Sequence, residues 1–135
     1  MGAWGHGSFE NDDAADFVAD VTEGSDLDRV RSTLDAVATG TGYLDAPDAS
    51  EAIAAAEIVA AILGRASPAA IEEEGLLAWA GQFSAEDGNA LAGVANAALT
   101  RILGEASELR ELWEEADEFD DWRASVEALR DLLPG

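Results

Sequence analysis

The chain has 135 residues, no cysteine and one histidine, and its 29 acidic residues outnumber seven basic ones, for a formal net charge of −22. The length fits one domain with a proper core. The lack of cysteine excludes disulfides and thiolate sites, and a lone histidine excludes most zinc sites. Nucleic acids and anionic membranes are not expected as partners, because they are negatively charged themselves.

The acidity has two explanations. The acids are spread over the whole chain, and all seven basic residues are arginine. This pattern favours salt adaptation, in which carboxylates keep the protein hydrated and soluble. The alternative is an acidic face that meets a basic partner. Both explanations stay open at the level of the sequence.

The sequence predicts a cytoplasmic protein. No stretch reaches the about 18 consecutive apolar residues that a membrane-spanning helix needs. The first residues show neither a basic leader nor a long apolar core, so we expect no secretory signal.

The first half of the chain predicts three helices, because apolar residues recur every three or four positions and alternating β-branched runs are absent. The first is expected from Asn11 or Asp12 to Asp20. The second is expected from Ser25 or Asp26 to Thr39, with glycines just beyond it. The third starts near Pro47, which suits a first helical turn, and ends before Gly64.

The third helix is expected at the centre of the fold. Between Ala52 and Leu63 its only charged residue is Glu57, so several neighbours should pack against it. On a helical wheel Glu57 shares a stripe with Ser50, Ala54, Ala61 and Arg65. We therefore expect the Glu57 carboxylate to face water.

The second half predicts a short helix from Pro68 to Trp79 and a long one capped by Ser84 and ending at Leu103. Residues 107–133 predict two helices, or one bent helix, with a break near 117–121. Two similar segments, ILGRAS at 62–67 and ILGEAS at 102–107, each close an alanine-rich helix. Shared helix-ending chemistry explains them, and duplication of a helical hairpin is the alternative. Trp79, Trp113 and Trp122 are expected in the core.

Glycines alternate with aromatic residues at the start of the chain, MGAWGHGSFENDD. We expect Trp4 and Phe9 to anchor residues 1–10 as a clasp against the helices. Asn11 should cap the first helix, and acids at 12, 13 and 16 suit its positive end. The predicted fold is a single all-α domain over residues 1–135, a compact bundle of about six or seven helices closed by this clasp.

The same opening residues resemble a known family. MGAWGHGSFENDDAADF is similar to the M-G-x-W-G-x-G-x-F-[DE]-N-D opening of the domain-of-unknown-function 4259 family of small microbial proteins. The segment SELRELWEEAD and the following Trp122-Arg123 helix resemble its C-terminal part. The resemblance implies no activity, cofactor or partner. It singles out these positions for folding or binding: Trp4, Gly5, Gly7, Phe9, Asn11 and Asp12. His6, which lies among them, is a further candidate.

A metal site is the chief catalytic alternative. DDAAD at 12–16 matches the D-D-x-x-D pattern with which helical prenyl-transferring enzymes hold magnesium, and carboxylate oxygens suit that ion. Asp12, Asp13 and Asp16 could thus serve a metal-assisted hydrolase together with His6 as a base. However, the second acidic motif that such enzymes need on a facing helix is missing, and a capped acidic helix start explains the same letters.

We therefore expect a non-catalytic protein-binding domain, an adaptor or inhibitor, with a protein partner that would be basic. No catalytic residue, cofactor or metal is expected, and the metal-assisted hydrolase is the alternative.

Overall fold

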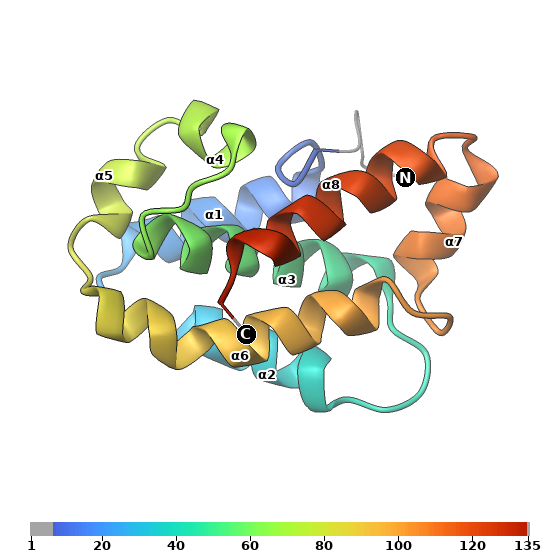
Figure 1. Ribbon diagram of the computed structural model, residues 1–135, viewed down its shortest axis with the longest axis horizontal. Helices are drawn as coiled ribbons and strands as arrows, with labels where there is room; N and C mark the ends of the chain where they lie inside the picture. The colour runs from blue at the N-terminus through green and yellow to red at the C-terminus, as the bar shows by residue number, and fades with distance from the viewer. Residues whose placement is uncertain (1–6, 135) are drawn as a thin grey trace.

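The computed structural model describes residues 7–134, and over this range it consists of eight helices and no strand (Figure 1). The expected all-α fold class is confirmed, and the expected count of six or seven helices was too low. The helices are α1 (Asp12–Glu23), α2 (Asp28–Thr39), α3 (Ala46–Ile62), α4 (Pro68–Glu72), α5 (Leu76–Ala80), α6 (Ala85–Ile102), α7 (Glu108–Glu115) and α8 (Phe119–Leu132).

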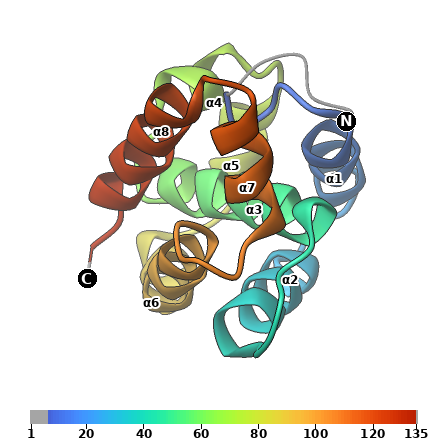
Figure 2. The same ribbon diagram turned by 90° about the vertical axis from the view of Figure 1, so that its right-hand side faces the viewer.

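Helix α3 forms the centre of the bundle, as expected. It contacts every other described helix, and the two ribbon views show the others arranged around it (Figure 2). Residues 52–60 are all buried, and most of them are alanine, whose small side chain lets neighbouring helices approach closely. The covering helices α1, α2, α6 and α8 each bury one apolar stripe against this centre.

The extra helix arises at Gly75, because the single helix predicted from Pro68 to Trp79 is two. Gly75 has a φ of +81°, a left-handed conformation that stops α4 from continuing into α5. The Trp79 indole N–H donates a 2.8 Å hydrogen bond to the carbonyl of Gly24, which ties α5 to the end of α1. Trp113 and Trp122 are 5% and 2% exposed and lie in the core.

Two helix boundaries differ from the prediction. α1 runs to Glu23, three residues beyond the expected end, because Val21 is buried and extends its apolar stripe. α2 begins at Asp28, later than expected, since the Asp26 side chain accepts a 3.0 Å hydrogen bond from the Asp28 N–H in the turn before the helix. The break between α7 and α8 falls where predicted, at Asp117, which has a φ of 60°.

The described part of the N-terminal segment supports the predicted clasp. Phe9 is 8% exposed and belongs to the core. It lies within a turn closed by a 3.1 Å hydrogen bond from the Glu10 N–H to the Gly7 carbonyl. Trp4, Gly5 and His6 lie outside the described residues, so the burial of the second predicted anchor stays a prediction.

None of the helices between residues 7 and 134 combines the length and apolar character that crossing a membrane requires.

Candidate functional site

The predicted residues at the start of α1 build the helix. The Asn11 side-chain oxygen accepts a 2.8 Å hydrogen bond from the Ala14 N–H, which confirms Asn11 as the N-cap. Asp12 and Asp13 lie in the first turn, where negative charge is favoured by the helix dipole. Their side chains and that of Asp16 are exposed.

No group of three or more acidic or histidine side chains within residues 7–134 is placed to hold a metal ion. That range includes Asp12, Asp13 and Asp16, whereas His6 lies outside it. The metal-assisted hydrolase therefore gains no support from this part of the structure.

A pocket of about 350 Å³ lies where the N-terminal segment meets α3, α4 and α8. Figure 1 shows the start of the described chain, in blue, beside α8. Of the residues singled out by the sequence, Gly7 reaches this pocket, and its neighbour Ser8 lines it as well. The other described lining residues are Glu57, Ser67, Pro68, Ala69, Ser125, Ala128, Leu129 and Leu132.

Glu57 provides the only titratable side chain among these described lining residues. It is 2% exposed, so the expectation that it faces water was wrong. The helical wheel placed it correctly on the stripe with Ser50 and Ala54, but that stripe is covered too, at 5% and 0% exposure. The N-terminal segment, α4 and α8, which line the same pocket, provide this cover.

Hydroxyl groups solvate the buried carboxyl. The Ser67 hydroxyl donates a 2.6 Å hydrogen bond to Glu57 Oε1, and Ser8 provides a second side-chain hydrogen bond. Burial raises the pKa of Glu57 above the ordinary glutamate value, and these two hydrogen bonds partly oppose the rise. Within the described range no arginine forms an ion pair with Glu57. The guanidinium of Arg65, which follows on the same stripe, donates to the Leu132 carbonyl at 3.4 Å.

The ILGRAS segment brings Ser67 to Glu57. α3 ends at Ile62. Gly64, two residues later, has a φ of +75° that turns the chain, and the Arg65 N–H bonds back to the Ala60 carbonyl at 2.9 Å. Ser67 then caps α4 by accepting a 3.2 Å hydrogen bond from the Ala70 N–H. The Ser67 hydroxyl thus caps the start of α4 and also donates to Glu57, ten residues earlier in the chain.

The similar ILGEAS segment has the same capping role, but no acid in the second copy corresponds to Glu57. Its serine, Ser107, caps α7 by accepting a 3.4 Å hydrogen bond from the Arg110 N–H. The residue that corresponds to Glu57, forty positions later, is Ala97. Helix-ending chemistry explains the likeness of the two segments, and the buried carboxyl is particular to the first.

A second hollow, of about 400 Å³, lies between α2, α3 and the loop that joins them. Three carboxylates line it, those of Asp45, Asp48 and Glu51. The arginine in its wall, Arg101, is used structurally: its guanidinium donates to the carbonyls of Val37 and Gly42 at 2.9 and 3.0 Å. This hollow is therefore part of the acidic surface.

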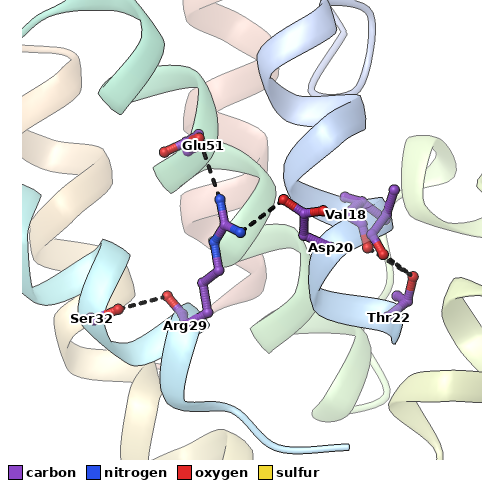
Figure 3. A network of polar contacts seen from close by, with 7 residues as sticks. Val18, Asp20, Thr22, Arg29, Ser32 and Glu51 are labelled. Carbon is purple, nitrogen blue, oxygen red and sulfur yellow. Dashed lines mark hydrogen bonds and ion pairs between the residues drawn. The ribbon is translucent and has the colours of Figure 1, made fainter. Parts of the chain in front are cut away.

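Internal contacts also occupy other arginines. Arg29 of α2 extends its guanidinium toward Asp20 of α1 and Glu51 of α3 (Figure 3). The guanidinium lies 2.9 Å from the Asp20 carboxylate and 3.7 Å from that of Glu51. Burial raises the pKa of Glu51, and Arg29 partly offsets that rise. Within residues 7–134, ion pairs engage only Asp20, Glu51, Glu114 and Asp120 among the acids.

Comparison with known proteins identifies one family. The model of the family described as domain of unknown function (DUF4259) matches residues 2–125. No curated protein and no solved structure matches the chain.

Proposed function

The chain belongs to the DUF4259 family, and we propose that it is a non-catalytic, cytoplasmic protein-binding domain, an adaptor or inhibitor that engages a basic partner. The observation that carries this proposal is the Glu57 pocket, which joins apolar walls to a buried carboxyl that has no cation beside it in the described structure. A pocket of a few hundred Å³ with a few convergent polar groups is the usual form of a binding site.

The polar groups of the pocket favour binding over catalysis. The Ser67 hydroxyl is held from both sides, because it donates to Glu57 and accepts from the Ala70 N–H. A serine fixed as a helix cap in this way is poorly placed to attack a substrate. Glu57 then acts as a fixed recognition group rather than as a base for a nucleophile.

The surface beside the pocket suits a protein. Pro68 in its wall and Ile71, which is 60% exposed, lie three residues apart on α4. Residues at this spacing are neighbours on one face of a helix. Apolar surface therefore extends beyond the pocket, as contact with a macromolecule requires.

The charge distribution supports a basic partner. Most of the 29 acids have no ion-pair partner in the described structure, and the arginines largely serve the fold. The field around the chain is therefore strongly negative, which speeds encounters with a positive surface and repels acidic proteins. Salt adaptation would produce the same composition without a specific partner, so the test must separate the two.

The test is affinity capture with a charge-matched control. The full chain and an unrelated acidic domain of equal net charge are immobilised and exposed to native extract at physiological salt. We expect a basic protein that the chain retains and the control does not, with retention falling as salt screens the charges. The captured protein is then purified, and its direct binding is measured. Equal retention by both surfaces would leave salt adaptation as the explanation of the charge.

A further inference from the structure

Glu57 is the strongest unexplained feature of the fold. A carboxylate in a protein interior is destabilising unless it is paired or fully hydrogen-bonded. Glu57 has two hydroxyl partners and no cation among the described residues. An apolar residue would fit the centre of an alanine-rich helix better, which points to a role for the charge outside the folding of α3.

The pocket in front of this carboxyl has the layout of a cation site with an apolar channel. Pro68 and Ala69 of α4 form one part of its wall, and Ala128, Leu129 and Leu132 of α8 form another. The polar groups are Glu57 and the hydroxyls of Ser8, Ser67 and Ser125. A ligand that fits has a flexible hydrocarbon stem and one small positive end.

We propose that the Glu57 pocket binds an alkylammonium group, presented as the side chain of a lysine on the basic partner. This inference rests on the proposed function, because it names the group by which that partner would be held. The lysine stem would pack on the alanine, leucine and proline walls, as lysine stems do on apolar surfaces. Its ammonium would form the ion pair that Glu57 lacks within the fold.

The same geometry disfavours other cations. A guanidinium pairs best with both oxygens of a carboxylate, but Glu57 Oε1 already accepts from Ser67. A quaternary ammonium is held by aromatic faces, and the described lining residues include no aromatic side chain. A compact ammonium with three donors can bond to the remaining oxygen and to the serine hydroxyls.

Binding should release protons. Burial raises the pKa of Glu57, so at a given pH a larger fraction of it carries a proton than of an exposed glutamate, and an incoming ammonium favours the charged form. The described lining of the pocket from the N-terminal segment, α4 and α8 contains no other titratable side chain. The released proton would therefore come from Glu57.

The test uses n-butylammonium, which has the length of a lysine side chain, in calorimetric titrations of the full chain. The pH is set between the ordinary glutamate pKa and neutrality, in two buffers of different ionisation enthalpy. We expect binding with proton release, and at least about tenfold weaker binding by Glu57→Gln. The matched control is Glu51→Gln, the same change on the same helix but outside the pocket, which should bind as the wild type does.

A second variant guards against misfolding of the first. Ala128 is exposed, so Ala128→Phe should fold while filling the mouth of the pocket, and it too should abolish binding. Unchanged binding by both Glu57→Gln and Ala128→Phe would overturn the inference. Equal binding of tetramethylammonium would also overturn it, since that result would mean general attraction to an acidic surface.

A separate arm distinguishes this inference from the proposed function. Lysine-only and arginine-only peptides of equal length are titrated into wild type and Glu57→Gln. The lysine peptide should lose affinity for the variant, and the arginine peptide should not. If both peptides bind wild type and variant alike, the lysine pocket is wrong and the basic-partner function stands. If n-butylammonium binds but neither peptide does, the pocket stands and the basic-partner function is wrong.

Discussion

The Ser67 hydroxyl donates to Glu57 Oε1 at 2.6 Å and accepts from the Ala70 N–H at 3.2 Å. A single side chain therefore begins α4 and solvates the one acid buried in α3. This relationship couples the stability of the fold to the charge state of the pocket, and it leads to the first two predictions.

Glu57→Gln should stabilise the protein at high pH and have little effect at low pH. Because the pKa of Glu57 is raised in the folded state, the native protein keeps a proton that the unfolded chain has already lost. Stability conferred by this residue therefore falls as pH rises from the ordinary glutamate pKa through the raised one. Gln has the same shape, carries no charge and keeps an acceptor for Ser67.

The measurement is urea unfolding of both proteins at pH 4 and pH 8. The difference in the free energy of unfolding should grow in favour of the variant as pH rises. The other acids are common to both proteins, so their pH dependence cancels in this difference. A variant that is less stable than wild type at pH 8 would mean that the charge itself stabilises the fold.

Ser67→Ala should cost about 1 kcal/mol from the lost helix cap and more at pH 8 than at pH 4. The added cost arises because the Ser67 hydrogen bond lowers the pKa of Glu57, so its removal leaves the charged carboxylate less solvated. Ser107→Ala is the matched control, since Ser107 caps α7 and the residue corresponding to Glu57 is Ala97. Identical pH profiles for the two variants would show that the Ser67–Glu57 bond has no energetic consequence.

Asn11→Ala should destabilise the protein by about 1 kcal/mol, because it removes the acceptor for the Ala14 N–H at the start of α1. Asn11→Asp should restore most of that stability, since an aspartate accepts the same hydrogen bond and suits the positive end of the helix. Thermal unfolding at neutral pH measures both effects. If Asn11→Ala unfolds at the wild-type temperature, Asn11 has a role other than capping.

Asp117→Gly should stabilise the protein by up to about 1 kcal/mol. Asp117 has a φ of 60° between α7 and α8, a conformation that costs an L-residue free energy and glycine nearly none. Asp117→Ala removes the same charge without relieving the strain, so it serves as the control and should not stabilise. Chemical denaturation compares the three proteins, and equal stabilisation by Gly and Ala would assign the effect to charge.

Local chemistry in the sequence was enough to predict much of the fold. Asn11 and Ser84 act as the predicted helix caps, because capping needs only a hydrogen bond to a backbone N–H three residues away. Phe9 is buried as expected. Gly75 was not predicted to split a helix, since a glycine inside a periodic segment does not reveal the sign of its φ.

The candidate site could not be predicted, because its parts meet only in three dimensions. A helical wheel treats α3 alone and cannot show that Gly7, Ser8, α4 and α8 cover the stripe that carries Glu57. The one available signal was the presence of a single charged residue in a helix expected to be surrounded. Trp4, the other proposed anchor of the clasp, lies outside the described residues, and its burial stays a prediction.

The most direct test of this account is the pKa of Glu57 itself. A ¹³C NMR titration of the side-chain carboxyl resonances, with Glu57→Gln to assign the signal, measures it with and without n-butylammonium. We predict a pKa above the ordinary glutamate value in the free protein and a lower one when the pocket is saturated, because an adjacent cation favours the charged form. A carboxyl that titrates at the ordinary value and ignores n-butylammonium would contradict both its burial and the proposed site.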